Sequence, residues 1–429
     1  MKLDKKVAYA LIGAGSLTLY GVFNSYTLFF YTDVVKLSAR WVGGTWFLFS
    51  FWNAINDIAS GWISDKSLRK VQKRSNLIKK LVFPVALCFI ILWHPLYKSI
   101  WYFLAVISVF DFFYSLLTLN YGAMFPKLFR DGRERIRASA INRAVGYGIG
   151  GGLTALAPLI YGGFGWSAMG ISLAILAASM YFIGVNEINE EPVKVTETNF
   201  LVTKQFQEAI RNMSFIYLMG IGVCLRFVLA VFVSLIPFYT KYVLGLGGGS
   251  SSILLLAFIG TSLVGLYYWE KIFRLYGTRK AMLLSLIIAV SFLIPFMFIQ
   301  NIELSILLLM ILGGASGGAM MMGPDLLFAE IIDDDHKKTQ RRREGVFAGL
   351  LGFTFRFPPA LVGLILGELL TVARYDANLS VTSQPEKVAH VIKTFFAVGP
   401  MIAMIVGIIL LCKYPLRGNK QIELLSVKV

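Results

Sequence analysis

Long apolar blocks, separated by short charged or turn-rich stretches, dominate the pattern along this chain. Many blocks run for about 20 residues or more, which is the length at which a helix crosses the hydrocarbon core of a bilayer. Reading each block between its breaks predicts twelve helices. We expect them at approximately 7–32, 40–63, 77–94, 99–125, 138–161, 166–185, 212–241, 250–271, 280–299, 303–331, 345–371 and 391–414. The predicted fold class is therefore all-α, a polytopic membrane protein.

The charged residues add an orientation to this pattern. The net charge of +17 would suggest a nucleic-acid partner in a soluble protein. Here the basic residues crowd into alternate loops, such as "SDKSLRKVQKRSNLIKK" after the second span, which holds seven basic residues and one acid. Because Lys and Arg accumulate on the cytoplasmic side, we expect both termini to be cytoplasmic and the protein to lie in the plasma membrane. We expect no nucleic-acid partner.

A long loop at about 186–211 divides the predicted spans into two sets of six. This layout is typical of the major facilitator fold. It predicts an N-terminal six-helix bundle over residues 1–186, a cytoplasmic central loop over 187–211 and a C-terminal six-helix bundle over 212–429. We expect a monomer.

The histidines and cysteines form no cluster in the sequence: they are His94, His336, His390, Cys88, Cys224 and Cys412. No metal-ligand or redox spacing links them. The sequence therefore predicts no metal site, no resident cofactor and no enzymatic activity.

The second span carries a charge inside an apolar helix. Asp57 lies about 10 Å from the cytoplasmic end of that span, by the rise of an α-helix. Asn53 lies four residues before it and Asn56 lies one residue before it. The three polar side chains therefore fall within little more than one helical turn. We expect them to share one helical face. A carboxylate beside two amide oxygens suits a hard cation. The same group would equally suit a hydrogen-bond cluster between helices.

Four other ionisable residues of the predicted spans are candidates for a functional role. Asp111, Arg226 and Arg356 are deep in the fourth, seventh and eleventh, and Arg143 is nearer the inner end of the fifth. A charge at bilayer depth costs about 2.5–3.5 kcal/mol on insertion scales, so it faces a partner or a water-filled cavity. Asp111, Arg226 and Arg356 each fit a structural ion pair or a pathway lining, whereas the position of Arg143 also suits a side chain that reaches the inner surface. The permanent charge of Arg356 favours the pathway.

Several segments resemble those of a known transporter family. They are "FFYTDVVKLSARWVGG", "FWNAINDIASGWISD", "FPKLFRDGRERIRASAINR" and "FAEIIDDDHKKTQRRREGVFAG". They resemble motifs of the glycoside–pentoside–hexuronide:cation symporters, the melibiose-permease-like family of the major facilitator superfamily. The similarity covers most of the N-terminal half and about 320–365. It implies a twelve-helix transporter that couples sugar movement to a proton or a sodium ion.

The resemblance places the family's cation site at Asn53, Asn56, Asp57 and Ser115. The family has a second aspartate where this chain has Asn53, and a proline where this chain has Ile58. One of the two carboxylates is therefore missing. The remaining carboxylate of Asp57 fits a proton or a weakly bound sodium ion as the coupling ion.

The family's sugar site is less well preserved. Its galactoside-binding aspartates fall at Leu17 and Thr118, and its tryptophan falls at Gly122, whereas its basic residues match Arg143 and Arg356. The predicted substrate-binding residues are Arg356, Arg143, Arg226, Asp111, Thr118, Leu17 and Gly122. A pocket with three arginines and fewer acids suits an anionic substrate, because a guanidinium pairs with a carboxylate in a bidentate fork.

These features predict a secondary transporter of a sugar, a glycoside, or an anionic sugar or organic acid, working by alternating access. Its partners are a small-molecule substrate and the lipid bilayer. Asp65, Asp333 and Arg342 are expected in a cytoplasmic gate, and each would equally suit a solvated loop charge. Three alternatives stay open. They are an uncoupled facilitator, a lipid or lysolipid carrier with an apolar pocket around Leu17 and Gly122, and a non-transporting receptor or scaffold, which leaves the buried arginines unexplained.

Overall fold

A computed structural model of the chain describes residues 3–129, 132–188, 190, 211–339 and 344–416. A few side chains inside these ranges, that of Asp65 among them, lie outside the description. Within the described ranges the regular structure is helical throughout, and no strand occurs. The predicted all-α class is confirmed.

Contacts between residues divide the chain into two compact units. The first comprises Met1–Thr198 with the short stretches Gly247–Ser252 and Asp376–Ser380, and the second comprises Asn199–Leu246, Ile253–Tyr375 and Val381–Val429. The predicted boundaries at 186 and 212 stay a prediction, because residues 191–210 lie outside the described ranges.

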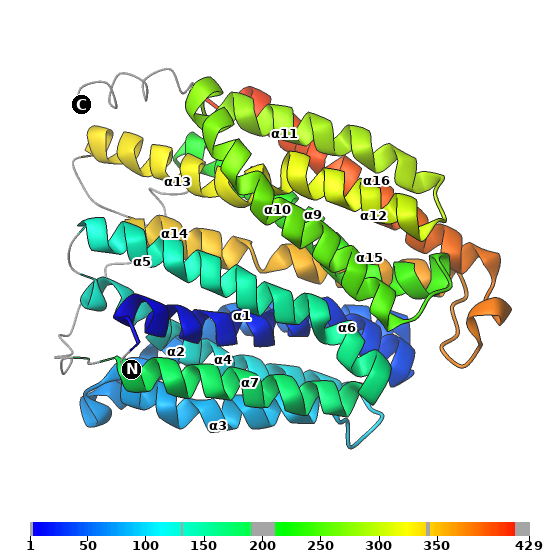
Figure 1. Ribbon diagram of the computed structural model, residues 1–429, viewed down its shortest axis with the longest axis horizontal. Coiled ribbons are helices and arrows are strands. Elements are labelled where there is room, and N and C mark those ends of the chain that lie inside the picture. Colours follow the sequence, from blue (N-terminus) through cyan, green and yellow to red (C-terminus); the bar gives the residue numbers. More distant parts are fainter. Residues whose placement is uncertain (1–2, 130–131, 189, 191–210, 340–343, 417–429) are drawn as a thin grey trace. The chain divides into compact units, whose positions relative to one another are not determined.

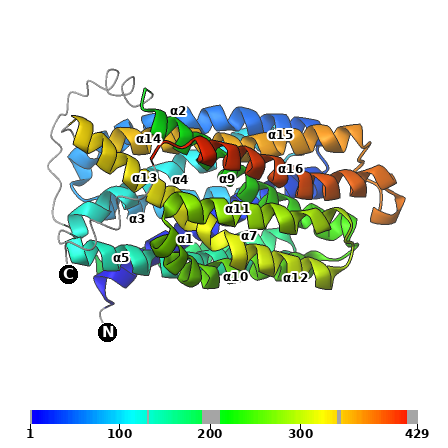
Figure 2. The ribbon, with the colours of Figure 1, turned by 90° about the horizontal axis from the view of Figure 1, so that it is seen from above.

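The first unit is a bundle of helices that run alongside one another (Figures 1 and 2). Its elements are α1 (Lys5–Phe29), η1 (Phe30–Val34), α2 (Ala39–Val71), α3 (Arg74–Trp93), α4 (Ile100–Leu128), α5 (Gly132–Val145), η2 (Gly146–Gly151), α6 (Gly152–Phe164) and α7 (Trp166–Glu187). Helix α1 packs against α5, η2 and α7, whereas α4 packs against both α2 and α3.

The second unit is built in the same way. Its elements are α9 (Met213–Phe238), η3 (Tyr239–Val243), α10 (Gly248–Tyr276), α11 (Thr278–Leu293), η4 (Ile294–Met297), α12 (Ile302–Leu312), η5 (Gly313–Gly317), α13 (Gly318–Thr339), α14 (Glu344–Thr354), α15 (Phe357–Val372), η6 (Val381–Ser383) and α16 (Glu386–Lys413). Helix α9 packs against α15 and α16, and α11 packs against α13 and α16. The first turn of α10, to Ser252, groups with the first unit.

Eleven helical stretches in the described residues are long and apolar enough to cross a membrane. Each coincides with one predicted span. The second predicted span is α2, which is 33 residues long and continues past its expected end at 63 through the basic stretch to Val71. It ends at Gln72, which has a φ of 62° and donates its N–H to Leu68 O at 2.8 Å. The polar and charged residues of α2 lower its mean hydropathy, so this helix is not among the eleven apolar stretches.

The core of the first unit buries two tyrosines whose hydroxyls are hydrogen-bonded. Tyr26 and Tyr31 have no exposed surface. Their hydroxyls donate to the main-chain oxygens of Thr154 at 2.8 Å and Leu92 at 3.0 Å. At Gly150 of η2, an added Cβ would lie 2.8 Å from a backbone oxygen of α1, so glycine permits this close approach of the two elements.

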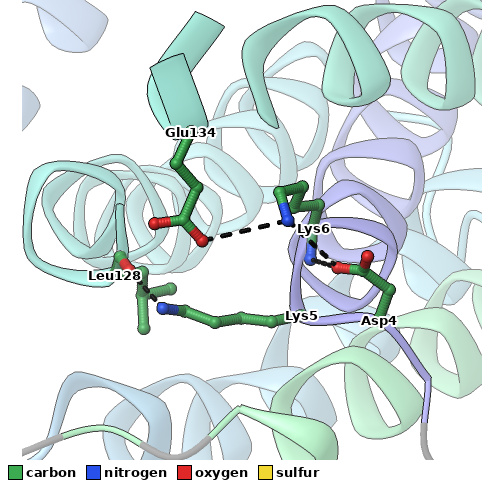
Figure 3. A network of polar contacts seen from close by, with 5 residues as sticks. All are labelled: Asp4, Lys5, Lys6, Leu128 and Glu134. Carbon is green, nitrogen blue, oxygen red and sulfur yellow. Dashed lines mark hydrogen bonds and ion pairs between the residues drawn. The ribbon is translucent and has the colours of Figure 1, made fainter. Parts of the chain in front are cut away.

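A charged group fixes the start of α1 against α4 and α5 (Figure 3). Lys5 Nζ donates to the main-chain oxygen of Leu128, at the end of α4. Lys6 Nζ lies 3.9 Å from Glu134 Oε1 of α5 and 3.8 Å from Asp4 Oδ1. These side chains are partly exposed, so such pairs contribute about 0–1 kcal/mol each. They hold three helix ends together within the first unit.

Helices α1 and α9 end in matching wide turns. In η1 the N–H of Val35 donates five residues back at 2.9 Å, and in η3 the N–H of Leu244 does the same at 3.1 Å. A left-handed residue follows each turn, Lys36 with φ 63° and Gly245 with φ 68°. Both turns redirect the chain after a long buried helix.

Candidate functional site

A buried carboxylate on α4 is held by two amides of α2. Asn53 Nδ2 donates to Asp111 Oδ1 at 2.9 Å, and Asn56 Nδ2 donates to Asp111 Oδ2 at 2.8 Å. Asp111 is 1% exposed and lies eleven residues after Ile100, about 17 Å along α4 by helical rise. The two asparagines are three residues apart, so they leave α2 on the same side and reach one partner. We call Asn53, Asn56 and Asp111 the carboxamide clamp.

Further polar side chains continue along the same α2–α4 interface. Ser60 Oγ donates to Asn56 Oδ1 at 3.0 Å, so the amide oxygen of Asn56 is also paired. Further along, Asn120 Oδ1 accepts from Ser64 Oγ at 2.9 Å and from an Arg74 guanidinium nitrogen at 3.0 Å. The interface of α2 and α4 is therefore paired by hydrogen bonds along much of its length, as expected for polar groups buried between membrane helices.

The structure brings together part of the predicted cation site. Asn53 and Asn56 meet at the clamp, and Ser115 lies on α4 one turn beyond Asp111, where it is buried. Asp57 is half-buried. It lies about 100° around α2 from Asn56, because successive residues of a helix turn by that angle. The sequence grouped these side chains on one face but did not predict that Asp111 joins the asparagines.

The predicted sugar-site positions of the first unit lie in contrasting surroundings. Thr118 Oγ1 donates to the main-chain oxygens of Tyr114 and Ser115, so its hydroxyl forms hydrogen bonds within α4. Leu17 is half-buried against Gly150 of η2. Gly122 is exposed, and an added Cβ there would meet no atom within 4 Å. Open space thus lies beside α4 where the resembling family has a tryptophan.

Two stacked tyrosine pairs between α1 and α4 were not predicted from the sequence. Tyr20 and Tyr114 have ring centroids 5.0 Å apart with an interplanar angle of 8°, and Tyr9 and Tyr121 have centroids 4.4 Å apart at 21°. The Tyr121 hydroxyl donates to Asn142 Oδ1 at 2.7 Å. The four tyrosines are visible in the sequence, but their pairing depends on how α1 and α4 pack against each other.

Arg143 follows Asn142 on α5 and is exposed. It lies six residues into the span Arg137–Phe164, which is about 9 Å by helical rise. The predicted position near one end of that span is confirmed, whereas its role as a substrate contact stays a prediction.

In the second unit, two predicted arginines lie close to a break in a membrane span. The span Val346–Val372 is interrupted between α14 and α15 at Phe355 and Arg356, just before Pro358 and Pro359. The guanidinium carbon of Arg226 on α9 lies 5.2 Å from the centroid of the Phe355 ring. This distance fits a cation–π contact. Arg356 itself is half-buried and occupies the N-cap position of α15, where its side chain makes no capping hydrogen bond.

The predicted gate residues lie at the end of the helices or outside the described residues. Asp333 is exposed on α13, whereas Arg342 and the side chain of Asp65 lie outside the description. Unpredicted contacts occur at the same end of the second unit. Thr278 Oγ1 donates to Glu330 Oε1 at 2.6 Å, and Lys338 Nζ lies 2.7 Å from Asp334 Oδ2. The assignment of a gate stays a prediction.

Among the described residues, no group of three or more His, Cys, Asp or Glu side chains could hold a metal ion.

The chain is similar in sequence to two bacterial transport proteins. The chain is 22% identical to an uncharacterized symporter of Synechocystis sp. over 363 residues, which is 62% of this chain and 66% of that protein. It is 26% identical over 258 residues to a protein of Escherichia coli described as a sulfoquinovose importer, covering 57% of this chain and 55% of that one. The chain thus matches about half to two thirds of the length of these relatives.

Solved structures share the fold at low sequence identity. A bacterial homolog of the human lysosomal transporter Spinster, inward-facing and unoccupied, superposes with a TM-score of 0.70 at 13% identity, over 96% of this chain and 95% of that one. A mutant form of the nucleoside transporter NupG has a TM-score of 0.67 at 13% identity, over 94% of this chain and 100% of that one.

The family model described as "MFS/sugar transport protein" matches residues 8–418, nearly the whole chain. Its family and structural neighbours are transporters, not enzymes. The family implies a small-molecule substrate and a multi-pass position in a membrane. The chain therefore belongs to the MFS/sugar transport protein family.

Proposed function

We propose that the protein is a cation-coupled symporter of an anionic sugar that works by alternating access in the plasma membrane. Symporters of this kind bind substrate near mid-membrane between two six-helix halves, which expose the site to each side in turn. The family supports a sugar substrate. One relative is named a symporter, and another is described as an importer of sulfoquinovose, a sugar that carries a sulfonate.

The observation that carries the anionic substrate is the position of Arg226. It lies thirteen residues after Met213, about 20 Å into a 31-residue span, and it is exposed. A guanidinium exposed to lipid at that depth would be costly, so its open side faces a water-filled cavity. Phe355 supports the side chain and leaves the N–H groups of its edge available.

Arg356 strengthens this assignment. It lies at the break between α14 and α15, where backbone helical pairing is interrupted inside a span. Irregular backbone at membrane depth occurs where it is buried in protein or lines a cavity. The amino end of α15 also carries the positive end of the helix dipole. An arginine pair of this kind suits a carboxylate or sulfonate, because guanidinium groups bind such oxygens in a planar fork.

Uptake by proteoliposomes tests the proposed function. Purified protein is reconstituted, and accumulation of glucuronate and sulfoquinovose is compared with that of melibiose and glucose under imposed sodium or proton gradients. We expect accumulation of at least one acidic sugar and at least tenfold less of the neutral ones. Uptake of neutral sugars alone would overturn the anionic substrate, and transport unaffected by both gradients would overturn the coupling and favour an uncoupled facilitator.

A second candidate function, a carrier of lipid-like amphiphiles, is favoured by one cavity. A space of about 550 Å³ lies between α9, α15 and α16 of the second unit. Its lining is almost entirely apolar, with Phe227, Leu369 and Ile402 among the side chains, and the few polar ones include His390 and Thr394. An apolar cavity with few polar groups suits an amphiphile. Exchange of a fluorescent lysophospholipid between vesicles, dependent on the protein, would support this function over sugar transport.

A further inference from the structure

The clamp contains a buried acid without a counter-charge. Both oxygens of Asp111 accept hydrogen bonds from the neutral amides of Asn53 and Asn56. Asp111 forms no ion pair within the described part of the chain. Tyr114 lies three residues after it on α4, and the Tyr114 hydroxyl donates to the main-chain oxygen of Ser16. Neutral hydrogen bonds stabilise a carboxylate without cancelling its charge.

The depth of Asp111 makes this lack of a counter-charge consequential. The residue is 1% exposed and near the middle of the 29-residue helix α4. A carboxylate taken out of water loses its hydration, and amide donors replace only part of it. A bound monovalent cation, either a proton or a sodium ion, removes the net charge. Depth, burial and neutral partners together point to such a cation.

The amides of the clamp can serve both states of the acid. Each presents nitrogen to Asp111 here, which is the arrangement that an ionised carboxylate requires. Rotation of an amide about its terminal bond exchanges its nitrogen for its oxygen. The oxygen can then accept from a protonated Asp111 or join the carboxylate and the nearby buried Ser115 hydroxyl around a sodium ion. A polar group that pairs with both states suits reversible binding.

Asp57 differs from Asp111 in each respect. It is half-buried, lies about 100° around α2 from Asn56, and has interactions of its own. The resembling family needs two carboxylates, and this chain has Asn53 at one of those positions. Asp111 places a carboxylate opposite that asparagine, from α4 instead of α2.

We propose that Asp111, with Asn53 and Asn56 as its supporting ligands, binds the coupling cation of this transporter, and that Asp57 does not. The proposal rests on the proposed symport, because a cation at the α2–α4 interface couples transport only if transport is ion-driven. Occupancy of Asp111 replaces an ionised carboxylate between two helices with a neutral group. The amides of α2 then present oxygen instead of nitrogen to Asp111 of α4. Binding of the ion therefore changes the contact between these two helices of the first unit.

Infrared spectroscopy of the purified, full-length protein without substrate tests the binding directly. The probes are protons and sodium ions alone. If a proton is bound, the wild type shows a C=O stretch of a protonated carboxyl that is missing in Asp111→Asn and kept in Asp57→Asn. If sodium is bound, exchange of choline for sodium shifts a carboxylate band in the wild type and in Asp57→Asn but not in Asp111→Asn. Absence of both signals, or their loss in Asp57→Asn with retention in Asp111→Asn, overturns the proposal.

Transport separates this proposal from the proposed function. With any sugar that the uptake panel identifies, Asp111→Asn is expected to lower gradient-driven accumulation at least tenfold and to keep equilibrium exchange within about threefold of wild type. Asp57→Asn is expected to keep both. Failure of all the sugars would reject the proposed substrate but leaves the infrared result standing. Asparagine has nearly the size of aspartate, and retained exchange shows that the variant is folded. Unchanged accumulation by Asp111→Asn overturns the proposal.

Discussion

A double-mutant cycle measures the free energy of the hydrogen bond between Asn56 and Asp111. Its magnitude shows whether the Asp111 carboxyl is ionised, because hydrogen bonds to charged groups are stronger. Asn56→Ala leaves Asp111 Oδ2 and the Ser60 hydroxyl without their partner at a site that is 1% exposed. A hydrogen bond to a charged group contributes about 1.5–3 kcal/mol and a neutral one about 0.5–1.5 kcal/mol, and an unpaired buried group adds a penalty. We therefore expect Asn56→Ala to lower the free energy of unfolding by about 2–4 kcal/mol.

The cycle uses Asn56→Ala, Asp111→Ala and the double variant, unfolded in mixed micelles by titration with a denaturing detergent. The coupling energy is the difference between the double variant and the sum of the single ones. An ionised Asp111 predicts a coupling of about 1.5–3 kcal/mol, and a neutralised one about 0.5–1.5 kcal/mol. The proposed cation site predicts that the coupling falls from the upper to the lower range when the cation is added.

Ser179→Ala on α7 is the matched control. Ser179 is exposed, and its hydroxyl donates to Ile175 O of its own helix at 2.9 Å. Its loss should change the free energy of unfolding by at most about 0.5 kcal/mol, as for most surface substitutions. A coupling near zero between positions 56 and 111, with both single variants folded, would refute the interhelical bond and with it the reasoning on the clamp.

Three other predictions follow from contacts at single residues. Gly150→Val should lower the free energy of unfolding by about 1–3 kcal/mol, because the valine side chain would overlap a backbone oxygen of α1. The control Gly148→Val meets open space and should leave the unfolding temperature unchanged. Equal effects of the two substitutions would contradict the packing of η2 against α1. Arg226→Lys keeps the charge but loses the bidentate fork, so the KM for an acidic sugar should rise about tenfold with little change in kcat; an unchanged KM would remove Arg226 from the substrate site. Gly122→Trp should fold normally, since no atom lies within 4 Å of an added Cβ, and should lower sugar uptake by occupying the open space; uptake at the wild-type rate would place the path elsewhere.

The spans could be predicted from the sequence because membrane helices are specified locally. An apolar block of sufficient length forms a helix whatever its neighbours do, since its backbone groups must pair within the segment. The predicted end of the second span was too early, because charged residues such as Lys66 lower the mean hydropathy without ending helix α2. The helix continues to Gln72, whose left-handed backbone ends it.

The clamp could be predicted only in part, because it depends on which helices meet. The spacing of Asn53 and Asn56 fixed their common face, but nothing local indicated that this face meets α4 at the depth of Asp111. The break at Arg356 was also missed. Two prolines follow it in the sequence, and a proline removes a helical hydrogen bond at the preceding turn, so Pro358 and Pro359 were the signal that could have found it.

The matching wide turns after α1 and α9 mark equivalent points of an internal repeat. Each turn is followed by a residue with positive φ, Lys36 in one unit and Gly245 in the other, although the sequences around them differ in charge. A shared irregularity is a more specific sign of a repeat than a shared helix, because a helix follows from composition alone. Internal repeats are typical of transporter folds. The two copies carry different chemistry, since the carboxylate of Asp111 lies in one and the arginine of the broken span lies in the other.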